Sequence, residues 1–498
     1  MDRCRHRPAA MSLTPDPDLC FLCGRQLASL IRSRQLSARE LMTAYLRQIE
    51  RINPSMNAIV AKLDDRSCLA LADEADRALA NRKSVGPLHG LPWAFKDLEA
   101  VVGFPFTNGS PIFQSNMPAE DTVLVERIRA AGAIPIGKTN VPEFGMGSHS
   151  YNRVYGTTRN PYDTTKSAGG SSGGAAAAVA AGLLPMADGS DLGGSLRNPA
   201  SFNNVVGFRP SVGLVPAAPV MLPFLGFSVK GPIARSVDDV AFLMSVIAGP
   251  DRRDPGSYPS EPSTFMQVLE RDFRGATIAW CPDLGGLPLD PQVRDVISRQ
   301  RATLEDLGCI VENASFDFHD ADDVFVTIRR WRSWIMFGNL LKEHRHAMKP
   351  EAVEEIEAGA ALTSADLARA MTRHAALLDR FRQFQETHEF LACTVSQVPP
   401  FEASNDWPHA IDGVQMGTYI DWMKSAYWIS TTFCPAISVP AGFTPNGLPV
   451  GLQVVGRARA DFSVLQLAHA FEQATRVGLR RPPSANASVI TSKQQPDL

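Results

Sequence analysis

Two serines follow pairs of glycines in short loops of the chain. Residues 167–174 read SAGGSSGG and residues 191–195 read DLGGS. Glycines without side chains let successive backbone N–H groups turn toward one point, which is what an oxyanion hole requires. Small apolar residues at 175–181 predict a helix that begins at Gly173 and Gly174 and directs its positive end at the first loop. Each loop taken alone is more simply explained as a tightly packed turn.

A lysine in the upstream segment PWAFKDL could supply the base that a serine nucleophile needs. A serine hydroxyl is a weak nucleophile until a base takes its proton, and no histidine in this sequence is placed to do so. Lys96 could serve if it were neutral, and burial beside Trp93, Phe95 and Leu98 would favour that form. In an extended segment Asp97 points to the opposite face, so it cannot simply pair with Lys96. The alternative is a structural lysine bonded to backbone carbonyls.

Together, the two loops and the lysine resemble the amidase signature family over about residues 37–480, most closely over 169–211. The resemblance implies that family's Ser–cis-Ser–Lys triad, with Ser195 as the nucleophile, Ser171 as the serine of a cis peptide and Lys96 as the base. It places the oxyanion-hole N–H groups on Leu192, Gly193, Gly194 and Ser195. The residues that would support the loops are Gly170, Ser172, Asp191 and Arg197. For Asp191 and Arg197 we expect an ion pair that fixes the turn rather than a contact with substrate.

Two departures from the family pattern follow the second loop. Asn203-Asn204 stands where the family commonly has Cys-Gly, and Arg209 stands in place of a frequent lysine. Both lie beyond the triad, so they concern substrate preference rather than the reaction.

The function that this resemblance implies is an amidase, a hydrolase of C–N bonds other than peptide bonds that acts through an acyl-enzyme on Ser195. We expect neutral, hydrophobic or aromatic amides as substrates, with aryl esters and carbamates (urethanes) as further candidates, and no cofactor or metal. Charged amino-acid amides and free glutamine should be poor substrates, because no charged cluster can be assigned to hold them. Two other interpretations stay open: a glutaminase subunit of a transamidation complex, and a binding protein that shares the fold.

Substrate contacts are predicted on both sides of the signature region. Gly145, Met146 and Gly147 precede the first serine loop, and the family resemblance implies that they border the cleft. Trp334 and Phe337 lie in an aromatic stretch that would suit the wall of an apolar pocket. The alternative is that these aromatic side chains fill the core.

Composition limits the partners of this 498-residue chain. It is 44% hydrophobic with a net charge of −3, typical of a globular protein without the basic field that nucleic acid would require. We expect a monomer or homodimer in the cytoplasm, acting on a small molecule and not on a membrane.

Eight scattered cysteines do not form a disulfide framework, and the CxxC of Cys20 and Cys23 lacks further metal ligands at suitable spacing. Translation could begin at Met1 or Met11.

Two other motifs in the sequence are misleading. Residues 132–139, GAIPIGKT, match the phosphate-loop pattern, but a helical pattern precedes them and Pro135 has no N–H to offer a phosphate. Residues 169–173 match the GxSxG nucleophile elbow, which must follow a buried strand, whereas a polar turn-forming segment precedes them here.

The elements that must position these residues alternate along the chain. Ser37-x-x-Glu40 is a capping box that begins a helix, which Asn53-Pro54 should end, and a strand is predicted in NAIVAKL. Helices alternate with short apolar strands up to the late strand VGLQVVG, which predicts an α/β fold: a large twisted mixed β-sheet covered by helices on both faces. We expect an N-terminal extension (1–36), a single domain (37–480) with a helical insertion at about 320–390, and a C-terminal tail (481–498).

Overall fold

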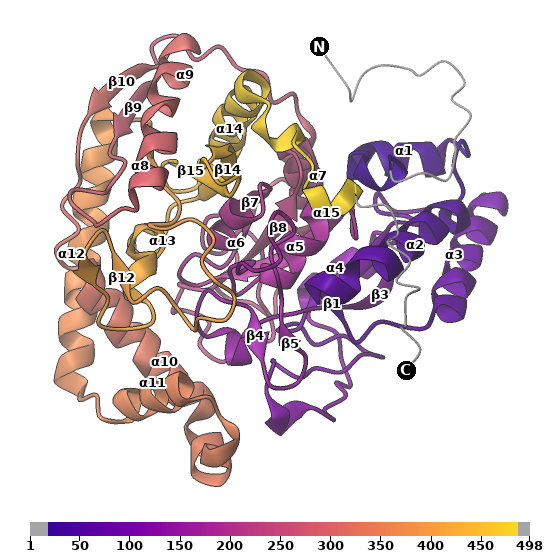
Figure 1. The fold of residues 1–498 in the computed structure, drawn as a ribbon, viewed down its shortest axis with the longest axis horizontal. Coiled ribbons are helices and arrows are strands. Elements are labelled where there is room, and N and C mark those ends of the chain that lie inside the picture. The colour runs from indigo at the N-terminus through magenta and orange to yellow at the C-terminus, as the bar shows by residue number, and fades with distance from the viewer. Residues whose placement is uncertain (1–17, 487–498) are drawn as a thin grey trace, which may run out of the picture.

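The largest element of the computed structural model, which describes residues 18–486, is an eight-stranded mixed sheet (Figure 1). Its strand order is β10-β9-β11-β15-β14-β7-β8-β6. Strand β9 pairs in parallel with β10 and β11, and the other neighbours are antiparallel. The bounds are β6 (Met186–Asp191), β7 (Val206–Arg209), β8 (Val229–Ala234), β9 (Thr277–Trp280), β10 (Ile310–Asn313), β11 (Phe390–Thr394), β14 (Ala436–Phe443) and β15 (Pro449–Val455).

Helices flank this sheet, so the predicted α/β class with a large mixed sheet is confirmed. Many of them follow a strand directly in the chain, which is how an α/β layered fold buries both faces of its sheet. Their bounds are α1 (Gly24–Arg32), α2 (Ala38–Met56), α3 (Asp65–Ala80), α4 (Val123–Ala130), α5 (Gly173–Ala180), α6 (Arg197–Phe202), α7 (Val237–Ile247), α8 (Pro291–Ser298), α9 (Gln300–Asp306), α13 (Lys424–Ser430), α14 (Asp461–Thr475) and α15 (Pro483–Asn486).

A three-stranded sheet of order β1-β3-β2 lies beside β6 and carries Lys96 at the end of its strand β2. Its strands are β1 (Ile59–Val60), β2 (Pro92–Lys96) and β3 (Ile134–Thr139), with β2 parallel to β3. Asp188 of β6 joins the two sheets, because its carboxylate accepts hydrogen bonds from Trp93 Nε1 at 2.9 Å and from Lys96 N at 3.1 Å. Two short hairpins complete the strands: β4 (Tyr151–Asn152) with β5 (Gly156–Thr157), and β12 (Ala410–Ile411) with β13 (Val414–Gln415).

Three helices occupy the segment in which the sequence pattern is almost wholly helical: α10 (Ala321–His344), α11 (Pro350–Ala360) and α12 (Ser364–Thr387). In Figure 1, α12 lies along the left edge of the molecule, α10 and α11 lie at the lower left, and the end of α10 with α11 extends away from the sheets. Strand β11 then returns the chain to the large sheet.

The N-terminal helices show where local signals suffice and where they fail. The capping box at Ser37 and Glu40 is present in full. The expectation that Asn53-Pro54 ends the helix is wrong, because α2 continues to Met56. Pro54 lies in the last turn, where few backbone bonds remain to be lost, and the helix ends at Asn57, whose φ of 54° is left-handed. Of the strand predicted in NAIVAKL, only β1 forms.

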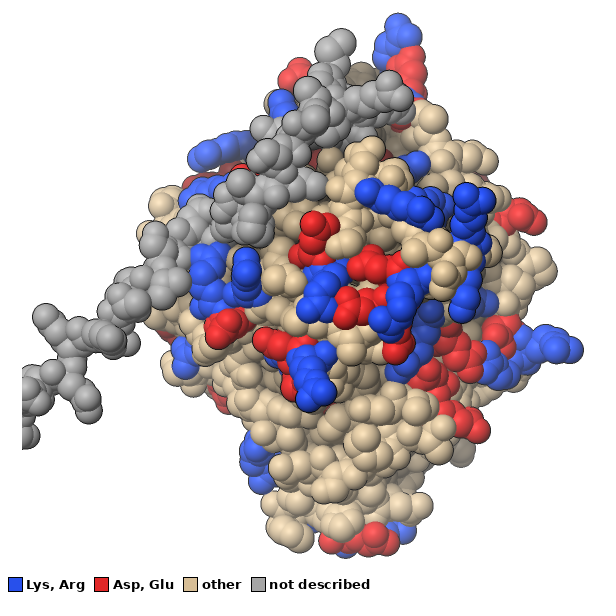
Figure 2. Space-filling model, turned by 90° about the vertical axis from the view of Figure 1, so that its right-hand side faces the viewer, with Lys and Arg blue, Asp and Glu red and all other residues tan. Residues whose placement is uncertain are grey.

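The ends of the chain fall partly outside the described residues, including both candidate start methionines and most of the expected tail. No helix within residues 18–486 is long and apolar enough to span a lipid bilayer. On the face shown in Figure 2, acidic and basic side chains are interspersed, in keeping with the small net charge.

Candidate active site

Lys96 contacts three serine hydroxyl groups at the junction of the two sheets. Its Nζ lies 2.8 Å from Ser171 Oγ, 2.7 Å from Ser172 Oγ and 3.0 Å from Ser190 Oγ. Ser171 and Ser172 belong to the loop before α5, and Ser190 belongs to β6. The fold thus brings the predicted lysine to the first serine loop, although 75 residues separate Lys96 from Ser171.

The environment of Lys96 favours the neutral amine. The side chain is fully buried, and burial is the main reason that its pKa is lowered to about 7. Asp97 does point away from it, as strand alternation predicts: its carboxylate accepts from the Thr107 hydroxyl and pairs with Lys138 at 3.2 Å. Among residues 18–486, no carboxylate forms an ion pair with Lys96, although Glu99, Asp188 and Asp191 oppose the lowering of its pKa.

The first serine loop is fixed by the segment of residues 148–150. The Gly170–Ser171 peptide is cis. Ser148 Oγ donates to the Gly170 carbonyl at 2.6 Å, and Ser150 N donates to the Gly169 carbonyl at 3.0 Å. On the other side of the loop, Ser172 N donates to the Ser195 carbonyl at 3.3 Å. This last bond joins the two serine loops directly.

The second serine loop is built around the carboxylate of Asp191 at the end of β6. Asp191 accepts from Arg197 Nε at 3.0 Å and Nη2 at 2.9 Å, and from Arg209 Nη1 at 3.1 Å. All three side chains are fully buried. Although burial by itself raises the pKa of Asp191, the charges of Arg197 and Arg209 outweigh it and hold the pKa far below its usual range. Arg209 is thus part of the same network as Asp191 and Arg197.

Of the four N–H groups predicted for the oxyanion hole, one is already engaged in this structure. Gly194 N donates to Asp191 Oδ1 at 2.8 Å. The N–H groups of Leu192, Gly193 and Ser195 have no hydrogen-bond acceptor among the described residues. Within the same residues, Ser195 Oγ makes no hydrogen bond either, and 8% of Ser195 is exposed. A hydroxyl and nearby N–H groups are therefore free to meet a carbonyl group.

Of the three residues predicted to border the cleft ahead of the cis peptide, Gly145 lies next to Ser171. A Cβ atom built on Gly145, whose φ is +70°, would lie 3.7 Å from Ser171 Oγ. The preceding Phe144 stacks on Phe337 of α10, with ring centroids 4.4 Å apart. Phe337 thus contacts the residue that precedes Gly145. Trp334 instead packs closely against Gly338 and Gly359, where α10 contacts α11.

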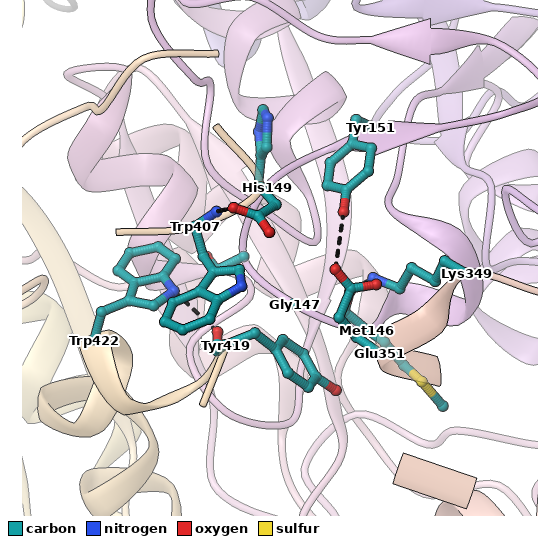
Figure 3. A pocket seen from close by; sticks show the side chains of 11 residues that line it. Met146, Gly147, His149, Tyr151, Lys349, Glu351, Trp407, Tyr419 and Trp422 are labelled. Carbon is teal, nitrogen blue, oxygen red and sulfur yellow. Dashed lines mark hydrogen bonds between the residues drawn. The ribbon is translucent and has the colours of Figure 1, made fainter. Parts of the chain in front are cut away.

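Met146 and Gly147 line a pocket with aromatic walls (Figure 3). The rings of Trp407, Tyr419 and Tyr151 surround it. Three charged side chains also line it: Lys349, Glu351 and Asp406. Lys349 Nζ donates to the Met146 carbonyl at 2.6 Å, and Glu351 accepts from Tyr151 OH at 3.5 Å.

Several of these neighbours had no clear sequence signal. Asp188 and Ser190 are two residues apart on one strand, and a period-two run of polar residues in a buried strand is a pattern that could have indicated them. Lys349 lies just before α11, and Glu351 lies in its first turn. Glu351 is 200 residues away in sequence from Tyr151, which it contacts, and no local pattern identifies either residue.

Neither misleading motif has the secondary structure that it requires. No strand lies between β5 and α5, so no strand leads directly into residues 169–173 as a nucleophile elbow requires. Residues 134–139 are strand β3, and Lys138 is buried, with its Nζ donating to the Glu99 carbonyl at 2.6 Å.

Among residues 18–486 there is no group of three or more His, Cys, Asp or Glu side chains that could hold a metal ion. Burial raises the pKa of the Cys20 thiol to about 12.

Comparison with known proteins places this geometry in a family. A family model described as Amidase matches residues 40–465. An acylamidase from Rhodococcus erythropolis is 34% identical over 460 residues, which is 92% of this chain and 96% of the relative. A glutamyl-tRNA(Gln) amidotransferase subunit from Synechococcus sp. (strain CC9605) is 33% identical and covers 91% of this chain and 96% of its own length.

Among solved structures, a bacterial aryl acylamidase of the amidase signature enzymes superposes with a TM-score of 0.86 at 28% identity, covering 93% of this chain and 99% of its own. Because the family model and these relatives span most of the sequence, the chain belongs to the amidase signature family.

Proposed function

We propose that this protein hydrolyses neutral, hydrophobic or aromatic amides through an acyl-enzyme on Ser195, with Ser171 and Lys96 as a proton relay. The observation that carries the proposal is the contact of a fully buried Lys96, whose pKa is lowered to about 7 by burial, with Ser171 Oγ at 2.8 Å. A neutral amine at hydrogen-bond distance from a hydroxyl can act as a general base near neutral pH.

Each proton in the proposed reaction has a donor and an acceptor. Ser195 Oγ attacks the amide carbon while its proton passes to Ser171 Oγ and the proton of Ser171 passes to Lys96 Nζ. The C–N bond breaks as Ser171 protonates the leaving amine and regains a proton from Lys96. Water then attacks the acyl-enzyme by the same relay and releases the carboxylic acid. The backbone N–H groups of Leu192, Gly193 and Ser195 would stabilise the oxyanion in both steps.

The walls of the pocket support an apolar or aromatic group in the substrate. Aromatic rings bury large areas and stack favourably on other rings. Trp407, Tyr419 and Tyr151 provide such surfaces beside Met146 and Gly147. Aryl esters and carbamates share the carbonyl group that the oxyanion hole would bind, so we propose them as further substrates.

A hydrolysis screen over anilides, aliphatic amides, aryl esters and carbamates tests this function. We expect the largest kcat/KM for an anilide and loss of turnover in Ser195→Ala. Turnover by purified, folded Ser195→Ala at the wild-type rate would overturn the proposal.

One observation favours a second candidate, the glutaminase subunit of a transamidation complex. Glu351 and Lys349 present opposite charges to the pocket, which could pair with the α-ammonium and α-carboxylate of free glutamine. The 33% identity to an amidotransferase subunit agrees with this candidate. Comparing kcat/KM for an anilide and for glutamine decides between them, since a clear preference for glutamine would replace the amidase proposal.

A further inference from the structure

A second lysine, Lys230, lies on the face of the large sheet that the side chain of Lys96 approaches from the smaller sheet. Lys230 of β8 is directly opposite Ser190 of β6 in the antiparallel ladder. Directly opposed residues of antiparallel strands carry their side chains on the same face. Because Ser190 Oγ lies 3.0 Å from Lys96 Nζ, the side chain of Lys230 extends on the face where Lys96 ends.

Glu99 holds Lys230 in place through a buried ion pair. The side chains of Glu99 and Lys230 are 1% and 15% exposed, and the second carboxylate oxygen of Glu99 accepts from Thr122 Oγ1 at 2.8 Å. The backbone of Glu99 is tied to the base itself, because Glu99 N donates to the Lys96 carbonyl at 2.9 Å. The ion pair is therefore fixed beside the turn that follows Lys96.

The charged groups that act on Lys96 come from three elements. Lys230 comes from β8, Asp188 and Asp191 come from β6, and Glu99 follows β2; the buried pair of Lys138 and Asp97 lies next to Glu99. After burial, the charge of Lys230 is the largest influence that lowers the pKa of Lys96, whereas the three carboxylates raise it.

We propose that Lys230 and Glu99 are positioning residues for the base: the fixed positive charge of Lys230 keeps Lys96 neutral near neutral pH, and Glu99 keeps that charge in place. A like charge nearby disfavours protonation of an amine. The inference rests on the proposed function, since it requires Lys96 to accept the proton of Ser171. It assigns a role to two residues outside the triad.

The pH dependence of kcat/KM for an anilide tests this role, because the two variants should shift it in opposite directions. The acid limb of the profile is the range in which kcat/KM falls as Lys96 becomes protonated. Lys230→Met removes the cation and leaves the Glu99 carboxylate, so this limb should move to higher pH by roughly half a unit or more. Glu99→Gln leaves the Lys230 cation uncompensated, so the acid limb should move to lower pH. Lys230→Arg keeps the charge and should keep the wild-type acid limb.

Arg271→Met is the matched control, because it breaks an ion pair with Glu389 at 2.6 Å, elsewhere in the fold, and should leave the acid limb unchanged. If Lys230→Met does not fold, the direction of the Glu99→Gln shift decides. The inference is overturned if Lys230→Met and Glu99→Gln both keep the wild-type acid limb, or if both shift it in the same direction. The proposed function still stands in that case, provided that Ser195→Ala is inactive. Full turnover by Ser195→Ala overturns the proposed function and, with it, this inference.

Discussion

Replacing Asp191 by Asn should destabilise the fold and disorder the nucleophile loop together. In the folded protein the Asp191 carboxylate pairs with two fully buried arginines, at 2.9 Å for Arg197 and 3.1 Å for Arg209, and also accepts from Gly194 N at 2.8 Å. An amide of the same shape removes the negative charge and leaves both guanidinium groups without a counter-charge. Breaking a buried ion pair by removing one partner costs about 3–5 kcal/mol.

That cost is a large part of the free energy of unfolding of a typical protein, which is about 5–15 kcal/mol. Urea unfolding followed by tryptophan fluorescence measures the free energy of unfolding, and kcat/KM for an anilide measured on the folded fraction reports on the loop. We expect both to fall, because one carboxylate oxygen of Asp191 accepts from Gly194 N and the other from Leu196 N, on the two sides of Ser195. An amide keeps only one of these two acceptor oxygens.

The matched control is Asp272→Asn, which removes a carboxylate from an exposed pair with Arg274, whose side chains are 58% and 83% exposed. Exposed pairs contribute little to stability, so this variant should unfold as the wild type does. Equal stability of the Asp191 and Asp272 variants would refute the reasoning, since it would mean that the buried charge network contributes no more than a solvated one.

Three further predictions concern the serines, the base and a glycine beside them. Ser195→Ala and Ser171→Ala should each lower kcat by at least about 10³-fold, because residues of one relay act as a unit, and near-normal turnover of folded Ser171→Ala would exclude it from the relay. Burial lowers the pKa of Lys96 to about 7, and the neutral amine is the proposed base. We therefore expect kcat/KM to be constant above this pH and to fall about tenfold per pH unit below it. A maximum of kcat/KM in acid would contradict this prediction. Gly145→Ala should lower kcat/KM for an anilide by about tenfold or more, because its Cβ would lie 2.7 Å from Leu98 Cδ1 beside Ser171; Gly103→Ala, also at positive φ but with nothing within 4 Å, should retain activity.

The chemistry of the site was predictable where it depends on local pattern. The glycine-serine loops at 169–174 and 191–195, the helix after the first loop, and the lysine in a short apolar strand are all features of neighbouring residues. The same local logic correctly rejected the phosphate loop, since residues 134–139 form a strand. It failed at Pro54, where the position within the last turn, rather than the residue type, decides the outcome.

Tertiary structure alone decided which distant groups surround the serines and the lysine. Asp188 joins the two sheets, Lys230 lies across a strand ladder from Ser190, and Lys349 reaches Met146 from a segment 203 residues away. Sequence periodicity indicates which face of a strand is buried, but the order of strands in a sheet and the electrostatic neighbours of a buried amine depend on long-range packing. By itself the sequence therefore determined the residue types and the local turns of the site, and the fold determined the charge environment in which Lys96 can be neutral.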